Sequence, residues 1–464
     1  MTNAQRKPCS PVPTAIHVVE PGVRTAQGAW RCQIGTNVEF STASLESYFF
    51  ARWEPVACDA LLVAAAVEFA DRALRRPAYT WQREFALRIP VHDTNRWNDR
   101  RVSETLRDAL GFLTGDRWHF EFYGRRKAMS SPQQSTLDLP TDVEAVIPFS
   151  NGLDSHAVAG LLAREMGSKL VRVRLGSKLR DTEPISRRRQ AFTSVPYHVN
   201  SGERAFVEST ARSRGFKFAL ISGLAAYLAG AGTIIVPESG QGALGPTLVP
   251  VGQSYEDYRS HPLFTGRMEE FLEALLGYRV RYSFPQLWYT KAETLRRFVN
   301  ECDGDSSWSA TWSCWQQNRH VSVEHKKRQC GICAACMLRR LSVHAAGLWE
   351  PKEAYVWEDL GASTFPAGAA ASFGKEKITR ALHEYAIAGT LHLDHLAGLL
   401  DSAANARMID LNIFQLSGAL SIQESDVRAK LHRLLRQHGT EWRSFVISLG
   451  QSSFVAEWAQ AGRP

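Results

Sequence analysis

The stretch Ala145-Val146-Ile147-Pro148-Phe149-Ser150-Asn151-Gly152-Leu153-Asp154-Ser155 decides the fold of this chain. Its apolar half has the character of a central parallel strand that is buried on both faces. Hydroxyl-bearing and small residues follow, and residues 156–163 continue at helical spacing. Because the N-terminus of a helix presents free backbone N–H groups, it attracts anions. The stretch therefore predicts a strand, a phosphate-binding loop over residues 150–155 and a helix. An ordinary strand-to-helix turn with an Asp or Ser cap is the alternative.

Four cysteines further along the chain follow the pattern C-x15-C-x2-C-x2-C. They are Cys314, Cys330, Cys333 and Cys336. Two overlapping CxxC units and one upstream thiolate are typical of a closed, tetrahedral zinc site that stabilises the fold. A [4Fe–4S] cluster is the main alternative, because soft thiolates suit both metals. His320 and His325 lie in the connecting loop and are alternative ligands.

Composition places the chain among globular proteins with two or three domains. It has 464 residues, of which 44% are hydrophobic and 22% charged. We find no apolar run of about 18 residues and no apolar N-terminal signal, so neither a membrane span nor secretion is predicted. Cysteines that cluster for a metal favour a reducing cytoplasm. The net charge of +8 favours phosphate-bearing ligands, nucleic acid or an acidic partner, but no nucleic-acid motif is present.

The order of the patterns predicts five segments. They are an N-terminal arm (1–25), a small α+β domain (26–126), a linker (127–141), a core with the cysteine segment (142–345) and a helical C-terminal extension (346–464). In the core, strands alternate with helices, which predicts an α/β fold with a doubly wound parallel sheet that binds ligands at the carboxyl ends of its strands.

Several local elements are also predicted. Ser103 is expected to cap a helix over 102–113, and residues 239–262 are expected to be a long structureless loop near the active site. Further helices are predicted over residues 203–214, 218–229, 376–388, 393–403 and 426–437.

The residues 150–155 resemble the SGGxDS pyrophosphate loop of the N-type ATP pyrophosphatases, which are similar in fold to the adenine nucleotide alpha hydrolases. Asn151 stands where that family usually has its first glycine. Asparagine is the non-glycine residue that best tolerates positive φ, so the loop geometry is compatible with it. The resemblance implies that ATP binds on the loop and is cleaved between its α- and β-phosphates. The implied ATP-binding residues are Ser150, Asn151, Gly152, Leu153, Asp154 and Ser155.

The loop and the later cysteines together resemble QueC, the 7-cyano-7-deazaguanine synthase family. Other segments support this resemblance over about residues 143–345. They are Arg214-Gly215-Phe216, Tyr255-Glu256-Asp257-Tyr258-Arg259, the Thr-Lys-x-Glu of residues 290–293, Thr311-Trp312-Ser313-Cys314-Trp315 and Cys336-Met337-Leu338-Arg339. The resemblance implies the cofactors ATP, Mg²⁺ and Zn²⁺, with Asp154, Ser155 and Lys291 as catalytic residues. In this scheme Asp154 binds Mg²⁺ and Lys291 stabilises charge at the α-phosphate. A surface lysine that caps a helix is the alternative for Lys291.

Three further residues are implied as contacts of a second substrate, a 7-deazaguanine. Asp257 suits the edge of the base, and Arg214 and Arg259 suit a carboxylate. The long flanks resemble those of QueC-like proteins in antiphage defence operons, of which QatC of the Qat system is the most similar. That resemblance implies an enzyme that adenylates the carboxylate of a deazaguanine and joins it to an amine, such as the N-terminus of a partner protein from the same operon. The alternatives are a 7-cyano-7-deazaguanine synthase that uses ammonia, a nucleotide-binding scaffold disabled by Asn151, and a tRNA-modifying relative.

Overall fold

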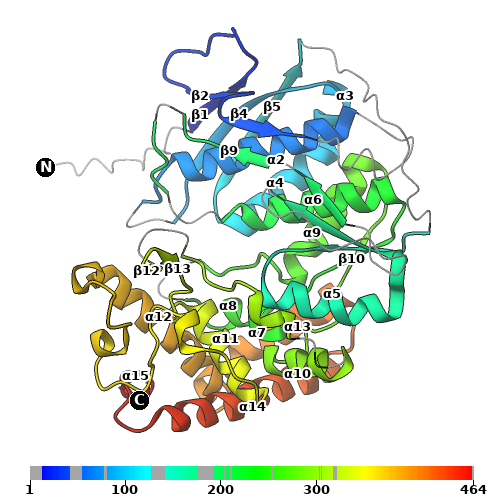
Figure 1. Cartoon of the computed structure of the whole chain (residues 1–464). Coiled ribbons are helices and arrows are strands. Elements are labelled where there is room, and N and C mark those ends of the chain that lie inside the picture. Colours follow the sequence, from blue (N-terminus) through cyan, green and yellow to red (C-terminus); the bar gives the residue numbers. More distant parts are fainter. Residues whose placement is uncertain are drawn as a thin grey trace, which may run out of the picture.

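The computed structural model describes residues 13–41, 55–77, 81–126, 142–175, 192–195, 197–202, 204–208, 212–251, 255–302, 304, 306–316 and 321–461. Two parallel sheets, the helices packed on them and a helical C-terminal part make up the structure (Figure 1). The predicted α/β class is thereby confirmed. Within these ranges, no helix is long and apolar enough to cross a membrane. The predicted linker, residues 127–141, lies outside the described residues.

The core sheet has the strand order β11-β10-β6-β7-β8, and all of its strands are parallel. The strands are β6 Ala145–Pro148, β7 Leu170–Leu175, β8 Phe192–Val195, β10 Thr233–Ile235 and β11 Arg281–Ser283. Along the chain, β7 and then β8 follow β6 on one side of it in the sheet, and β10 and β11 come later on its other side. The order of the strands therefore reverses between β6 and β10, and the loop that follows β6 lies at the position where doubly wound sheets bind ligands.

Alternate residues of β6 face opposite layers of helices. Val146 packs into the cluster that contains α6 (Arg214–Ala229) and α9 (Pro262–Leu276), whereas Ala145 and Ile147 pack against α5 (Leu153–Met166). Because side chains alternate along a strand, a strand that is apolar at successive positions must be covered on both faces. The short apolar run of residues 145–149 is explained in this way.

A second parallel sheet precedes the core, with the order β2-β1-β4-β5. Its strands are β1 Thr14–Val19, β2 Trp30–Gln33, β4 Glu84–Val91 and β5 Arg117–Gly124. The predicted α+β character of this part is wrong, because all four strands are parallel. The predicted arm of residues 1–25 also differs, since β1 pairs with two neighbours inside the sheet. This strand is only six residues long and was not recognised in the sequence.

The helices of the two sheets form one continuous hydrophobic core. Helices α2 (Pro55–Ala73) and α4 (Arg100–Thr114) of the N-terminal part pack against α6 and α9 of the core. Strand β3 (Val38–Phe40) pairs antiparallel with β9 (Tyr197–Val199) and joins the two parts again. Consequently the N-terminal segment cannot be separated from the core without exposing apolar surface of both.

The remaining α-helices and strands follow β10 in the sequence, except α3, which lies between β4 and β5. They are α3 Thr94–Trp97, α7 Gly240–Ala243, α8 Gly245–Leu248, α10 Lys291–Glu301, β12 Ser322–Val323, β13 Lys326–Lys327, α11 Ala334–Ala345, α12 Arg380–Ala397, α13 Ala406–Leu420, α14 Glu424–Leu449 and α15 Phe454–Ala461. The two helices predicted over 376–388 and 393–403 are a single helix, α12, and α14 is far longer than the helix predicted over 426–437.

Three other local predictions are wrong. Residues 204–208 are not helical, and α6 begins at Arg214 and includes the helix predicted over 218–229. The segment 239–262 is not structureless, because α7 and α8 lie within it. The cap of α4 is Asp99 rather than Ser103, and its carboxylate accepts hydrogen bonds from the backbone N–H groups of Arg101 and Val102.

The C-terminal helices are packed into the molecule. One cluster joins the four cysteines to Trp442, Phe445 and Phe454 of α14 and α15. A second joins Ala243 of α7 and Leu248 of α8 to isoleucines and leucines of α13 and α14. Burial of a large apolar side chain stabilises a fold by about 1.5–3 kcal/mol, so this interface makes a major contribution to stability.

Deletion of residues 375–464 should therefore yield an insoluble or unfolded chain, because it exposes both clusters. Soluble yield and the cooperative loss of circular dichroism on heating measure whether the truncated chain folds. Deletion of 462–464 is the control. A soluble truncated chain with a cooperative melting transition would contradict the expectation.

Candidate nucleotide and metal site

The loop after β6 is braced by its two serines. The Ser155 hydroxyl lies 3.0 Å from the Ser150 hydroxyl and donates to backbone carbonyl oxygens of the loop, while Ser150 Oγ accepts from the backbone N–H of Gly152 at 3.1 Å. Helix α5 begins directly after Gly152, and no side chain caps its N-terminus. The first N–H groups of α5 are therefore available to an anion, whereas the serines hold the shape of the loop.

Asn151 does not need the left-handed backbone that the sequence suggested for it. Among the described non-glycine residues, only Glu324, His325 and Ser421 have positive φ. Gly152 also has a negative φ, −85°. The loop thus accommodates a side chain at position 151 without backbone strain, and Asn151 is exposed.

Lys291 forms an ion pair with Asp154, a contact across 137 positions of the chain. Lys291 is buried, which is inconsistent with a surface lysine that merely caps a helix. The other carboxylate oxygen of Asp154, Oδ1, is buried and has no hydrogen-bond partner in the described structure. An unpaired carboxylate oxygen beside a phosphate-binding loop fits a hard cation such as Mg²⁺, which takes oxygen ligands.

Helix α10 presents Lys291 in a fixed position. Thr290 and Glu293 form a capping box at its start, with the Thr290 hydroxyl accepting from Glu293 N–H and the Glu293 carboxylate accepting from Thr290 N–H. The C-terminal helix α14 holds both residues. The Thr290 hydroxyl donates to Glu441 at 2.8 Å, and Arg433 forms an ion pair with Glu293.

A second contact from α14 reaches the backbone of Lys291. Its N–H donates to Gln241 Oε1, and the Gln241 amide lies 2.8 Å from His438 Nδ1. Burial lowers the pKa of His438 to about 4, so its ring is neutral, and Nε2–H donates to the Leu393 carbonyl oxygen. The C-terminal part therefore positions the residue that pairs with Asp154.

The structure brings the four predicted cysteines together in a buried cluster. Their sulfur atoms all lie within 4.8 Å of one another, and Cys330 and Cys336 are 3.7 Å apart. A tetrahedral zinc ion with Zn–S bonds of about 2.3 Å requires sulfurs about 3.8 Å apart. Backbone N–H groups donate to Cys314, Cys330 and Cys333 Sγ, as is usual for metal-bound thiolates. The donor set fits zinc.

The alternative histidine ligands are not supported. His325 is exposed in a turn between β12 and β13 and is not part of the cluster, and His320 lies outside the described residues. Four thiolates fill a tetrahedral zinc site, so this zinc would leave no position for a substrate.

The cysteine segment contacts the phosphate loop directly. Trp312, two positions before Cys314, donates its backbone N–H to the Asn151 carbonyl oxygen at 2.6 Å. Arg339 in α11 fixes the same segment: its fully buried guanidinium donates to Thr311 Oγ1 at 2.7 Å and pairs with Glu350 at the same distance. The Cys-x-x-Arg motif thus connects the cysteine cluster to the wall of the loop.

The three residues predicted for a second substrate lie near one another. Asp257 forms an ion pair with Arg259, and Arg214 begins α6. Gly215 allows this arrangement, since a Cβ there would lie 2.8 Å from Arg259 Cβ. The segment is held against the N-terminal part, where the Tyr255 hydroxyl donates to the Phe112 carbonyl oxygen of α4.

Glu238 is a candidate that the sequence did not single out. Burial and the nearby Asp154 raise its pKa to about 7, against the opposing effects of Lys291 and Arg259. The charged neighbours of Glu238 therefore include a residue of the 150–155 loop and the Asp257–Arg259 pair. Its position three residues after β10, at the carboxyl end of the sheet, was a usable signal.

Known protein families provide an independent comparison. A family model described as "Queuosine biosynthesis protein QueC" matches residues 243–347. Residues 243–347 form a QueC family domain. This QueC domain contains Lys291, the Asp257–Arg259 pair and all four cysteines, whereas the phosphate loop lies before it. A comparison with curated proteins finds no match to this chain.

The purified chain should contain one zinc ion, and the Cys333→Ser/Cys336→Ser double variant should lose it together with thermal stability, because thiolate zinc sites stabilise folds directly. Metal analysis by mass spectrometry and a melting curve measure both effects. Cys302→Ser, outside the cluster, serves as the control and should retain the metal. Full zinc content in the double variant, or iron in place of zinc, would refute the assignment.

Glu238 should make stability depend on pH. Since its pKa in the folded chain, about 7, exceeds its ordinary value of 4.5, the folded chain keeps a proton that the unfolded chain has released between these values. The free energy of unfolding should therefore fall as pH rises from 5 to 8, and the fall should be smaller in Glu238→Gln. Urea unfolding at each pH measures the free energy of unfolding, with the exposed Glu270→Gln as control. If this free energy falls with pH as steeply in Glu238→Gln as in the wild type, the prediction is wrong.

Proposed function

We propose that this protein is an ATP-dependent, AMP-forming ligase that activates a 7-deazaguanine carboxylate and joins it to an amine by a C–N bond. The observation that carries the proposal is the Lys291–Asp154 ion pair at the uncapped N-terminus of α5. It combines a cation, a metal-binding carboxylate and free N–H groups at one point, which is the combination that a triphosphate requires. The QueC domain in residues 243–347 supports the substrate class.

ATP would bind along residues 150–155 with its β- and γ-phosphates at the N-terminus of α5. Bound Mg²⁺ would neutralise charge on the departing pyrophosphate, with Asp154 Oδ1 as its ligand from the chain. Lys291, released from part of its contact with Asp154, would stabilise the negative charge that develops at the α-phosphate. Ser155 would keep the loop in shape through its hydrogen bonds to residues 150 and 152.

The second substrate would bind on the other side of Glu238. Its carboxylate would pair with Arg214 or Arg259, and its base edge with Asp257. The carboxylate oxygen attacks the α-phosphorus, the bond to the bridging oxygen breaks, and pyrophosphate leaves. An amine then attacks the acyl carbon and AMP leaves.

The amine must lose a proton in that second step, and we propose that the Glu238 carboxylate accepts this proton. A carboxyl group with a pKa of about 7 matches the ionisation that a general base needs near neutral pH. The charged neighbours of Glu238 include Asp154, from the proposed ATP site, and Asp257, from the proposed site of the second substrate, which supports this role.

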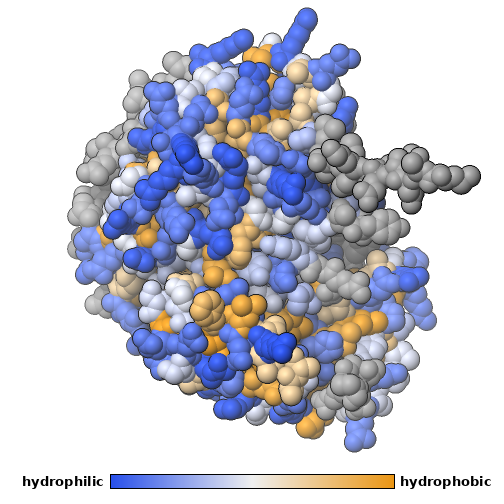
Figure 2. All heavy atoms as spheres, turned by 180° about the vertical axis from the view of Figure 1, so that it is seen from behind, coloured by the Kyte–Doolittle hydropathy of each residue, from blue (hydrophilic) through white to orange (hydrophobic). Residues whose placement is uncertain are grey.

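We also propose an acceptor amine and a biological setting. We place the protein in the cytoplasm, with the QatC-type proteins of antiphage defence, and propose a protein partner from the same operon as acceptor. A partner surface is available on α13, where Leu411 and Phe414 are more than half exposed. Figure 2, the view from behind, shows hydrophobic residues gathered in the lower half, where the C-terminal helices lie.

With ATP, Mg²⁺ and 7-carboxy-7-deazaguanine, the chain should release pyrophosphate and AMP. Asp154→Asn and Lys291→Met should each lower this rate ~100- to 1000-fold, because each removes a group that stabilises phosphate charge. Lys352→Met, at an exposed lysine, is the matched control and should be fully active. Phosphorus NMR of the products makes the measurement.

Formation of ADP, or unchanged AMP formation in Asp154→Asn, would overturn the proposal. Addition of ammonia distinguishes the acceptors. If ammonia alone completes the reaction to the nitrile, the chain is a 7-cyano-7-deazaguanine synthase. ATP binding without any turnover would instead identify the nucleotide-binding scaffold.

A further inference from the structure

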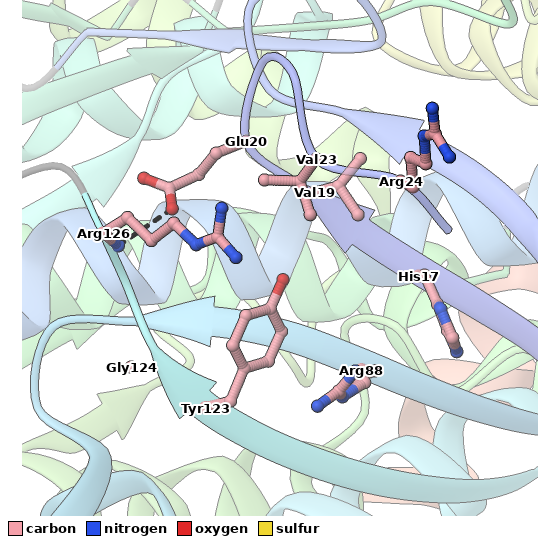
Figure 3. A pocket seen from close by; sticks show the side chains of 9 residues that line it. All are labelled: His17, Val19, Glu20, Val23, Arg24, Arg88, Tyr123, Gly124 and Arg126. Atoms are coloured by element: carbon pink, nitrogen blue, oxygen red, sulfur yellow. Dashed lines mark hydrogen bonds between the residues drawn. The ribbon is translucent and has the colours of Figure 1, made fainter. Parts of the chain in front are cut away.

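A cavity with a volume of about 310 Å³ lies in the N-terminal sheet, outside the site described above (Figure 3). Its walls come from β1, β4, β5 and the connection between β1 and β2. A second hollow, of about 550 Å³, adjoins it and shares Glu20, Val23 and Arg126. The two form a continuous groove at the carboxyl end of the sheet.

The groove lies at the position where parallel sheets usually bind ligands. After β1 the chain builds β2 on one side and later β4 and β5 on the other, so the strand order reverses between β1 and β4. Helices α2 and α4 pack on the face of this sheet that is turned toward the core, and Figure 1 shows the other face of the sheet without a covering helix in the described ranges. His17 and Arg88 are register partners on that open face. A crevice at such a reversal is the common ligand position in open α/β sheets.

The residues that line the cavity carry surplus positive charge. Arg88 is paired with Glu121 at 2.8 Å, and Glu20 is offset by Arg125 at 3.5 Å. The guanidinium groups of Arg24 and Arg126 make no hydrogen bond or ion pair with any described residue. Figure 3 shows the Arg126 side chain extending into the cavity between Glu20 and Tyr123. Both side chains are exposed, and two guanidiniums together match the charge of a dianion.

A neutral donor completes the lining. His17 Nδ1 accepts a hydrogen bond from Ala26 N–H at 3.4 Å, so the ring proton resides on Nε2. Burial and then Arg88 lower the pKa of His17, which keeps the ring uncharged. The Tyr123 hydroxyl is already engaged, because it donates to the Val18 carbonyl oxygen at 2.9 Å.

We propose that this cavity binds a small phosphomonoester, with Arg24 and Arg126 pairing the phosphate and His17 Nε2–H donating to one of its oxygens. A phosphate dianion matches two guanidiniums in charge, and the planar fork of arginine fits pairs of phosphate oxygens. A volume of about 310 Å³ is at the lower end of ligand cavities and admits a sugar-phosphate-sized molecule. The proposal does not depend on the ATP chemistry of the core.

Calorimetric titration of the full chain with ribose 5-phosphate at low ionic strength tests the proposal. We expect saturable binding at one site, weakened about 10-fold or more in Arg24→Ser and further in Arg24→Ser/Arg126→Ser, because each charge-assisted contact contributes about this factor. The matched control is Arg75→Ser/Arg117→Ser, which removes the same charge from two exposed arginines without described partners. It should bind as the wild type does.

The outcomes separate a built site from general electrostatics and from the core. Absence of saturable binding in the wild type would overturn the proposal. If both double variants bind ribose 5-phosphate more weakly to the same degree, the binding is non-specific attraction by net charge and the proposal is wrong. Unchanged binding in Arg24→Ser/Arg126→Ser would show that ribose 5-phosphate binds at another place, which would overturn the proposal. Succinate binding as tight as that of ribose 5-phosphate would show that the cavity does not select phosphate, which would also overturn it.

Discussion

The cysteine tetrahedron is the constraint on which the rest of the site depends. It fixes Cys314 beside Cys330, Cys333 and Cys336, and thereby fixes Trp312, whose backbone N–H holds the carbonyl oxygen of Asn151. The phosphate loop is consequently shaped by a segment about 160 positions later in the chain. A closed thiolate site contributes folding free energy outright, so the geometry of the loop is linked to metal binding.

The second support of the loop is the ion pair between Lys291 and Asp154, and it depends on the C-terminal part. Glu441, Arg433 and His438 of α14 hold the start of α10. The segment that looked like an appendage is therefore part of the site. The N-terminal part has a similar role for the segment proposed to bind the second substrate, because α4 accepts a hydrogen bond from Tyr255. Both flanks help to shape the core that lies between them.

The sequence predicted the core well because its signals were local. A buried strand, a loop of small residues and clustered cysteines each leave a pattern within a few positions. It failed where structure depends on distant contacts: the six-residue β1 joins a sheet through partners that no local pattern reveals, and Pro-rich residues 239–262 form α7 and α8 against leucines of α13 and α14. Glu238 was missed for the same reason, since its charged neighbours come from three separate segments, around Asp154, Asp257 and Lys291.

The central claim is that residues 150–155 bind the triphosphate of ATP, with Asp154 and Lys291 beside it. A crystal structure of the full chain with Mg²⁺ and α,β-methylene ATP, which cannot be cleaved between these phosphates, tests it most directly. We expect the β- and γ-phosphates at the N-terminus of α5, the metal on Asp154 Oδ1 and Lys291 at the α-phosphate. A triphosphate bound away from this loop, in the N-terminal cavity for example, would contradict it.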